Sequence, residues 1–131
     1  MMAEVSIQAF LPWDIRRVWE TVTAVEHYGW RSDLSRTEVL GGGRFVEYTR
    51  EGYPTSFTTT AWEPCRRWEF DMENSRMTGH WTGLFREAEG GTQVVFTETA
   101  VPGNPLLRPF AARYLRRHQA RFLADLKRAL G

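Results

Sequence analysis

The last segment of the chain, residues 104–130, has the sequence NPLLRPFAARYLRRHQARFLADLKRAL, and the predicted fold is built around it. Asn104 and Pro105 mark its start. An Asn side chain accepts hydrogen bonds from the free N–H groups of a first helical turn, and a Pro at the first position costs no helical hydrogen bond because an N–H there would have no partner within the helix. An apolar stripe recurs at about 100° per residue and comprises Leu107, Ala111, Leu115, His118, Phe122, Leu126 and Ala129, with Tyr114 at its edge. We therefore expect one long helix, which needs a surface against which to bury this stripe.

The composition is that of an ordered domain. The chain has 131 residues, of which 42% are hydrophobic and 25% are charged, so a disordered chain is excluded and one core is possible. We find no internal repeat and no linker, and we expect a single domain over residues 1–131. The net charge is +1, which gives no overall attraction to nucleic acid or to a membrane.

Cysteine use and hydropathy predict a cellular compartment. Cys65 is the single cysteine, so no internal disulfide can form and a reducing compartment fits. Glu4 and Gln8 interrupt the first apolar run, unlike in a signal peptide, and no apolar run approaches the length of a membrane span. We therefore expect a cytoplasmic protein.

The rest of the chain predicts one short helix and a series of strands. Residues 4–10 alternate between apolar and polar side chains, as in a half-buried strand. Apolar residues from Ile15 to Val22 recur at helical spacing and predict a helix over residues 12–23, whereas residues 25–34 fit a second short helix or a loop. Six further strands, separated by short turns, follow at residues 37–40, 44–50, 55–63, 68–72, 77–87 and 92–101.

This order of elements predicts the architecture. Consecutive strands joined by short turns form an antiparallel meander, and a meander of this length curls. The fold class is therefore α+β: a curved antiparallel sheet of about seven strands wrapped around the long C-terminal helix, with two short helices after the first strand. One helix fills the concave face only in part, so we expect a space lined by aromatic side chains between helix and sheet.

Four stretches carry a resemblance to a known family. They are Pro12…Val18-Trp19, Trp62-Glu63-Pro64 followed by Arg66-Arg67-Trp68-Glu69-Phe70, Gly90-Gly91-Thr92-Gln93-Val94, and Leu123…Leu126-Lys127. Their order and spacing resemble the polyketide cyclase/dehydrase-like branch of the START-like (SRPBCC) superfamily across the whole chain. This resemblance implies the helix-grip fold and an apolar ligand held between the sheet and the C-terminal helix. It implies neither cyclisation nor dehydration, because most members carry no shared catalytic set.

Three residues are candidates for acid or base chemistry: His118, Glu98 and Tyr114. His118 interrupts the apolar stripe, so it is either a neutral core histidine bonded to a neighbouring group or a polar contact for a ligand. Glu98 shares a strand face with Val94 and Phe96, and either it points inward, where burial raises the pKa of a carboxyl group, or a bulge turns it to solvent. A Glu98–His118 pair would be the best acid/base constellation of the chain.

The aromatic residues supply both the core and the candidate ligand contacts, since apolar pockets with a few polar groups are the usual ligand sites. The candidate ligand-binding residues are Trp19, His27, Trp30, Tyr48, Trp62, Trp68, Phe70, Trp81, Phe96, Tyr114 and His118. The resemblance implies that His27 and Trp30 lie near the cavity mouth, where they could act as a gate. No pair of histidines has metal-ligand spacing and no phosphate-binding glycine loop is present, so we expect no metal and no cofactor.

The basic residues gather towards the end of the chain. Residues 104–131 hold seven of the 17 basic residues and one of the 16 acidic residues. A solvated outer helix face is the simplest interpretation, and attraction to an anionic membrane or an acidic carrier partner is the alternative. We expect no nucleic-acid binding, because no aromatic platform accompanies these charges, and no stable membrane insertion.

Three functions fit these observations. The first is a binding protein for a small apolar or aromatic molecule, favoured by a dry aromatic cavity. The second is a cyclase or dehydratase that acts on a polyketide-like substrate through His118, Glu98 and Tyr114, favoured by a polar cavity in which Glu98 contacts His118. The third is a module that binds a partner protein, favoured by a collapsed interior. A homodimer is possible in each case.

Overall fold

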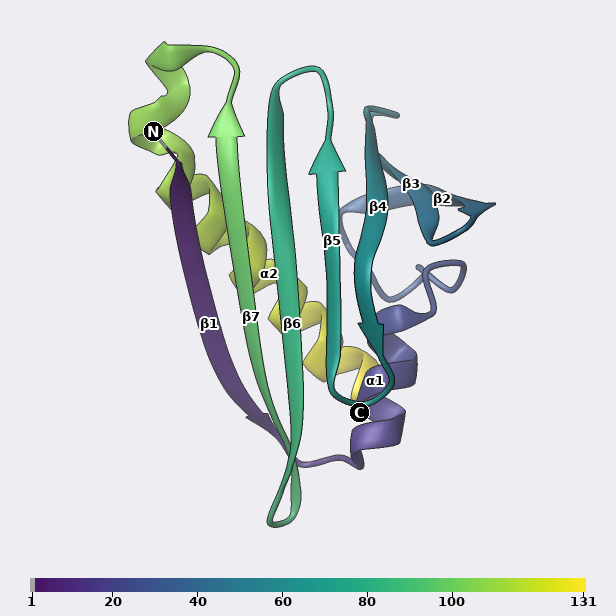
Figure 1. Ribbon diagram of the computed structural model, residues 1–131. Coiled ribbons are helices and arrows are strands. Elements are labelled where there is room, and N and C mark those ends of the chain that lie inside the picture. The colour runs from purple at the N-terminus through teal and green to yellow at the C-terminus, as the bar shows by residue number, and fades with distance from the viewer. Residues whose placement is uncertain (1) are drawn as a thin grey trace.

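Seven strands build one antiparallel sheet in the computed structural model, which describes residues 2–131. The strands are β1 (Ala3–Leu11), β2 (Leu34–Gly41), β3 (Arg44–Thr49), β4 (Pro54–Glu63), β5 (Arg67–Glu73), β6 (Met77–Ala88) and β7 (Gly91–Pro102). Their order across the sheet is β1-β7-β6-β5-β4-β3-β2, so the last strand pairs with the first (Figure 1). All seven strands predicted from the sequence are confirmed, with ends that differ by a few residues.

One short helix, α1 (Ile15–Thr23), follows β1. The Asp14 side chain caps it by accepting a hydrogen bond from the backbone N–H of Arg16 at 3.0 Å. Its apolar face is buried against the sheet and the C-terminal helix, as the helical spacing predicts.

The second short helix does not form. Residues 24–33 are a loop of separate turns, closed by backbone hydrogen bonds from His27 N–H to Ala24 O at 2.9 Å and from Arg31 N–H to Tyr28 O at 2.8 Å. Each bond closes one turn and none continues into a helical ladder, so the cost of nucleation is not recovered. The loop runs between α1 and β2 and passes beside the concave face of the sheet (Figure 1).

The C-terminal segment is two helices rather than the predicted one. A 3-10 helix, η1 (Pro105–Phe110), precedes α2 (Ala111–Leu130). Asn104 caps the start by accepting a hydrogen bond from the Leu106 N–H at 3.0 Å, as predicted. The single-helix prediction is wrong because Pro109 has no N–H, and its ring would collide with the carbonyl group four residues earlier in an α-helix.

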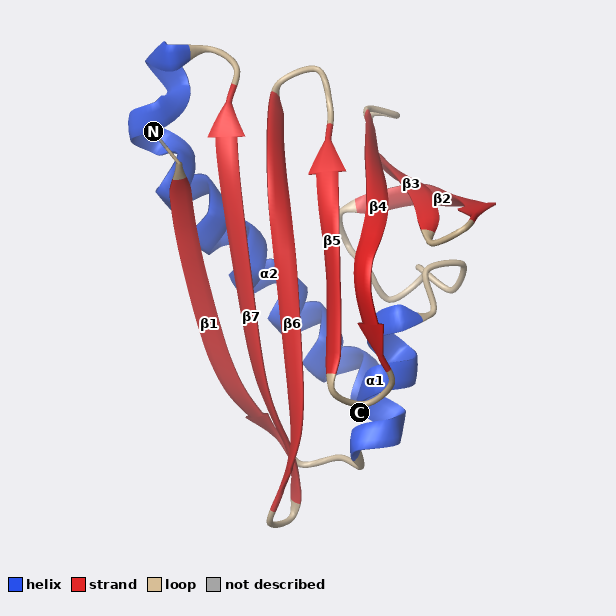
Figure 2. Cartoon of the chain, viewed as in Figure 1, coloured by secondary structure: helices blue, strands red, loops and turns tan. Residues whose placement is uncertain are grey.

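The buried face of α2 is wider than the predicted stripe. Its buried residues are Ala111, Leu115, Gln119, Leu123, Asp125, Leu126 and Leu130. Leu107 of the predicted stripe lies in η1 and is 48% exposed, while His118 and Phe122 are half-buried. The reason is that two sides of α2 face the interior as the helix crosses the sheet (Figure 2). One side packs on β1 and β7, and the other, which carries His118 and Phe122, faces a cavity.

An aromatic cluster forms the core on the concave side of the sheet. Phe45 stacks on Phe57 with ring centroids 4.7 Å apart, and Phe70 stacks on Trp81 at 4.9 Å. Phe96 is fully buried and lies 5.2 Å from Trp81, centroid to centroid. Strands β3 to β7 therefore join one continuous aromatic layer, which also supplies part of the cavity wall.

Leu123→Ala should lower the free energy of unfolding by about 2–4 kcal/mol, because it removes a buried side chain of the core cluster. Leu107→Ala, the same chemical change in η1, should alter it by less than about 0.5 kcal/mol. Urea unfolding of both variants measures the two values. Equal losses would mean that η1 is packed like α2 and would contradict the structure.

Candidate functional site

A cavity of about 600 Å³ lies between α2, the concave face of the sheet and the loop of residues 24–33. Its apolar wall is largely aromatic and includes Trp30, Leu34, Phe45, Phe57, Trp68, Phe70, Met72, Trp81 and Phe122. Its polar side chains include Arg31, Asp33, Glu47, Glu98, Tyr114 and His118. This volume and this mixed wall are typical of sites for small organic ligands.

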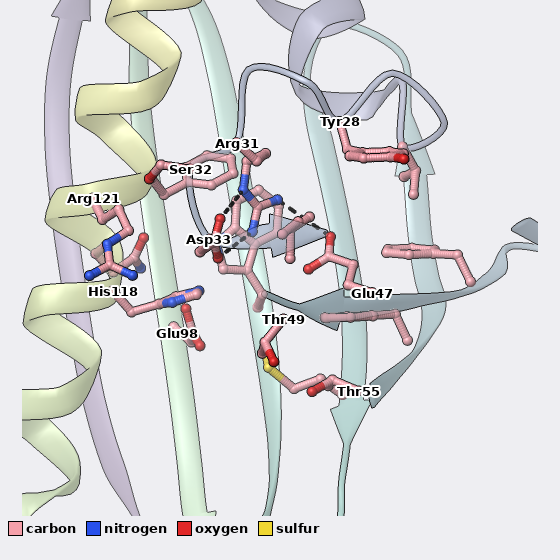
Figure 3. A pocket seen from close by; sticks show the side chains of 18 of the residues that line it. Tyr28, Arg31, Ser32, Asp33, Glu47, Thr49, Thr55, Glu98, His118 and Arg121 are labelled. Carbon is pink, nitrogen blue, oxygen red and sulfur yellow. Dashed lines mark hydrogen bonds and ion pairs between the residues drawn. The ribbon is translucent and has the colours of Figure 1, made fainter. Parts of the chain in front are cut away.

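A buried ion cluster forms one side of the cavity (Figure 3). Asp33 accepts two hydrogen bonds from Arg31, Nε to Oδ1 and Nη2 to Oδ2, both at 3.0 Å. Glu47 accepts a third from Arg31 Nη1 at 3.4 Å. The Arg31 side chain is only 10% exposed and each carboxylate 15%, so the positive charge of Arg31 is balanced inside the protein rather than by solvent.

The three charges shift one another's pKa values. Burial favours a lower pKa for Arg31, but the charges of Glu47 and Asp33 outweigh it and keep the guanidinium protonated. Burial likewise opposes ionisation of Asp33, yet the adjacent Arg31 charge holds its pKa below the usual range. At Glu47 burial prevails over the attraction of Arg31, and the pKa is raised. The result is a fixed cation between two carboxyl groups of unequal acidity.

Sequence reasoning missed this cluster. Arg31 and Asp33 lie in the segment whose sequence fits either a helix or a loop, and no periodicity there indicates which side chains point inward. The position of Glu47 could have been inferred from strand alternation. Glu47 lies two residues after the core residue Phe45 and two before Thr49 in β3, so Phe45, Glu47 and Thr49 share one face of the strand. All three of these strand residues line the cavity.

The same loop is tied to α2. Asp125 is 3% exposed and accepts hydrogen bonds from the Ser32 N–H and from Ser32 Oγ, each at 2.8 Å. Arg50 donates from Nε to Ser32 O at 3.1 Å. These bonds join residues far apart in the sequence and hold the loop across the cavity as a wall.

Glu98 reaches the cavity from the middle of β7. The register is unbroken on both sides, with Glu98 opposite Val5 in β1 and Trp81 in β6, so the alternative of a bulge that turns it to solvent does not occur. The residue is 4% exposed, and no group within residues 2–131 hydrogen-bonds to its carboxyl group. Burial, followed by the charge of Glu47, raises the pKa of Glu98 to about 8, against the opposing charge of Arg31. At neutral pH it is mainly an uncharged acid that can donate a hydrogen bond.

His118 lies on the wall that α2 contributes. Figure 3 shows its ring directed into the same part of the cavity as the Glu98 carboxyl group. Burial and the charge of Arg31 lower the pKa of His118, with the charge of Asp33 opposing them, so the imidazole is neutral at pH 7. No hydrogen bond joins His118 to Glu98 among the described residues; the two groups share a cavity without a direct bond.

Seven of the eleven candidate ligand-binding residues line the cavity: His27, Trp30, Trp68, Phe70, Trp81, Tyr114 and His118. Tyr114 is 51% exposed at the rim, where its ring lies parallel to that of His118 with centroids 6.1 Å apart. Trp30 packs edge-on against Phe122 at 5.5 Å between centroids. His27 lies in the same loop with its side chain in solvent, and the gating role of His27 and Trp30 stays a prediction.

The other four candidates lie elsewhere. Trp19 and Trp62 form an edge-to-face pair, with centroids 5.2 Å apart, beyond the cavity lining. Tyr48 points away from the cavity because it alternates with Glu47 in β3, and its ring lies 3.8 Å from the guanidinium carbon of Arg36. Phe96 belongs to the core and is outside the lining as well. None of the four lines the cavity, although Phe96 packs against the lining residues Trp81 and Phe122.

The curled antiparallel sheet, the C-terminal helix that crosses it and the cavity between them define the helix-grip class of proteins. Residues 2–131 match the family described as "Polyketide cyclase / dehydrase and lipid transport", and the chain belongs to this family. The resemblance expected from the sequence is thereby confirmed. A comparison with proteins of curated function yields no match.

Solved structures share the fold at low sequence identity. A protein from Mesorhizobium loti is 15% identical with a TM-score of 0.81, and the alignment covers 97% of this chain and 96% of that one. A START superfamily protein from Mycobacterium smegmatis is 11% identical with a TM-score of 0.81, covering 95% and 94%. The di-domain ARO/CYC BexL of the BE-7585A biosynthetic pathway is 15% identical with a TM-score of 0.75, covering 96% of this chain and 49% of that one. At these identities the likeness establishes the fold alone.

Two further findings concern residues 2–131 as a whole. None of the helices described there has both the length and the apolar character needed to cross a bilayer. Over the same residues, no three or more His, Cys, Asp or Glu side chains are grouped so that they could hold a metal ion.

The buried Glu98 should make folding less favourable as the pH rises. The folded protein keeps this proton up to about pH 8, whereas the unfolded chain releases it near 4.5, so between these values the folded state binds more protons and loses stability with increasing pH. The loss amounts to at most about 1.4 kcal/mol per pH unit. Glu98→Gln cannot titrate, so its free energy of unfolding relative to the wild type should rise by roughly 2 kcal/mol between about pH 5.5 and pH 7.5, measured by urea unfolding. A difference that stays constant over this range would show that Glu98 is already ionised in the folded protein.

Proposed function

We propose that this protein binds a small hydrophobic or aromatic molecule in the cavity between the sheet and α2. The observation that carries the proposal is a cavity of about 600 Å³ with an aromatic wall and one unpaired, buried carboxyl group, Glu98. Stacking rings would supply most of the affinity, and the few polar groups would set the orientation of the ligand. The family description, which names lipid transport beside polyketide chemistry, agrees with a ligand of this class.

Further expectations complete the proposal. We propose a cytoplasmic protein, in keeping with a single cysteine that has no partner for an internal disulfide. We also keep the single domain over residues 1–131 and the possible homodimer. A module that only binds partner proteins is less well supported, because its expected signature was a collapsed interior and the cavity is open.

A large side chain placed inside the cavity should weaken ligand binding. Thr55 lines the cavity, whereas Thr58, three residues along β4, is exposed on the other face of the strand. Thr55→Phe should therefore lower ligand affinity by at least about tenfold, and Thr58→Phe should leave it unchanged. Native mass spectrometry of each protein purified from its own host measures the co-purifying small molecule. Recovery of no molecule by the wild type, together with no thermal shift in a screen of aromatic compounds and fatty acids, would contradict the proposal.

A second candidate function is a cyclase or dehydratase that acts on a polyketide-like substrate. The observation in its favour is that an uncharged acid, Glu98, and a neutral imidazole, His118, reach the same cavity, with the Tyr114 ring beside His118. An acid and a base kept in different environments are what proton transfer to and from a carbonyl compound requires. The ARO/CYC structure with the same fold suggests the reaction class to test.

The enzyme candidate predicts separate effects on rate and on binding. Glu98→Gln keeps the shape of the side chain but cannot transfer the acid proton, so turnover of an aromatic polyketide bound in the screen should fall by at least about a hundredfold. Affinity for the same compound should change by less than about threefold. Product formation followed by chromatography, with Thr58→Phe as the control variant, distinguishes the two. If the wild type forms no product from any bound compound, the protein is a binding protein only.

A further inference from the structure

The polar groups inside the cavity differ in whether the protein itself supplies their hydrogen-bond partners. Arg31 is the cavity's inner cation, and Asp33 and Glu47 already bind it through three hydrogen bonds of 3.0 to 3.4 Å. Its guanidinium also lies 5.0 Å from the centroid of the Phe122 ring. This cation is therefore occupied by the protein itself and is not free to neutralise a charged ligand group.

Glu98, unlike Arg31, has no hydrogen-bond partner for its side chain among the described residues. Its residue is 4% exposed, its carboxyl group faces the cavity, and no group in the described chain hydrogen-bonds to it. An ionised carboxylate would be buried here without a partner, which costs several kcal/mol, so the protonated form is the stable one. A protonated carboxyl group that has no acceptor in the protein is a hydrogen-bond donor directed at whatever fills the cavity.

The charges around Glu98 exclude a second anion. The loop contributes Arg31 and Asp33, β3 contributes Glu47, and α2 contributes the neutral His118. A carboxylate placed beside Glu98 would lose its hydration and face the charges of Asp33 and Glu47 without a free cation. The other arginines of the lining, Arg50, Arg117 and Arg121, are exposed, and Arg121 lies near enough to His118 for its charge to lower the pKa of that imidazole. Solvent screens these exposed charges, so they offset the burial of an anion beside Glu98 only in part.

The geometry points to a ligand whose inner end is an uncharged hydrogen-bond acceptor, a carbonyl or hydroxyl oxygen that accepts from Glu98, and to discrimination against carboxylate-ended molecules of the same shape. This inference rests on the proposed ligand-binding function and narrows it to a chemical class. It separates ketones, aldehydes, phenols and alcohols from molecules of the same shape whose carboxylate would lie beside Glu98. Glu98 is here a binding residue, whether or not the protein also catalyses a reaction.

Three naphthalenes of nearly equal shape test the inference by isothermal titration calorimetry. They are 2-acetylnaphthalene, which carries a neutral acceptor, 2-naphthoate, which carries a carboxylate, and 2-ethylnaphthalene, which carries neither. At about pH 6.5, where the naphthoate is ionised and Glu98 is not, the acetyl compound should bind at least about tenfold more tightly than the naphthoate. It should bind about fivefold more tightly than the ethyl compound, as one hydrogen bond predicts.

Two variants assign the preference to Glu98. Glu98→Gln retains an N–H donor of similar shape and should preserve the preference for the acetyl compound over the ethyl compound. Glu98→Leu retains the volume without a donor and should remove it, so that affinity for the acetyl compound falls about fivefold while affinity for the ethyl compound changes by less than about twofold. Circular dichroism melting shows whether each variant is folded before titration. If Glu98→Leu does not fold, Glu98→Gln is compared with the wild type across the three ligands, and the preference for the acetyl compound should persist.

Each outcome has a distinct meaning. Equal binding of the acetyl and ethyl compounds, or tighter binding of the naphthoate, would overturn the inference and leave the proposed function intact. Retention of the acetyl preference in Glu98→Leu, which has no donor, would show that Glu98 does not bind the acceptor and would also overturn the inference. If none of the three compounds binds to the wild type, the proposed binding of aromatic ligands itself fails.

Discussion

Helix α2 packs closely on only part of the concave face of the sheet, and the cavity, its loop wall and its buried charges all follow from this. Leu115, Leu126 and Leu130 bury one flank of the helix, which lies on β1 and β7. The sheet continues through β5, β4 and β3, too far for one helix to cover. Protein interiors are normally close-packed, so side chains would be expected to fill the space that α2 leaves uncovered. Here the stacked rings of the concave face and the loop of residues 24–33 border this space, and it stays open as a cavity.

That loop can form a wall because its polar groups are satisfied on both sides. Arg31 binds Glu47 of β3, and Ser32 binds Asp125 of α2. Buried ion pairs of this kind contribute little net stability, since the loss of hydration offsets most of the attraction between the charges. Their effect is positional: they give a chain segment without helical or strand hydrogen bonds a single location. Loss of the Arg31 contact would leave the Glu47 carboxylate without a partner inside the protein, whereas Asp125 would still pair with Arg128 if the Ser32 contact were lost.

The same interior chemistry explains why Glu98 differs from its neighbours. Asp33 and Glu47 reach the cation of Arg31, whereas Glu98 projects from β7 and reaches only the cavity. Burial therefore raises its pKa to about 8. A domain that places an unpaired acid in its core gives up stability at that position. Sites of this kind concentrate where proteins bind or transform ligands, and this one lies between aromatic walls that suit a small organic molecule.

The seven strands, the first helix and the cap at Asn104 could be predicted from the sequence, because alternation, helical spacing and turn residues are local properties of the chain. The effect of Pro109 on a helix is equally local, so the break between η1 and α2 was within reach of the same reasoning. The family followed from the resemblance of four short stretches. The sequence also placed His118 within the apolar stripe, but for Glu98 it left open whether the side chain points inward or a bulge turns it to solvent. The loop in place of a second helix and the partners of Arg31 became clear only from the folded structure. Those depend on contacts between segments distant in the chain. Periodicity shows which side chains leave the solvent, whereas the fold decides whether a buried charge meets a partner, as Arg31 does, or an open cavity, as Glu98 does.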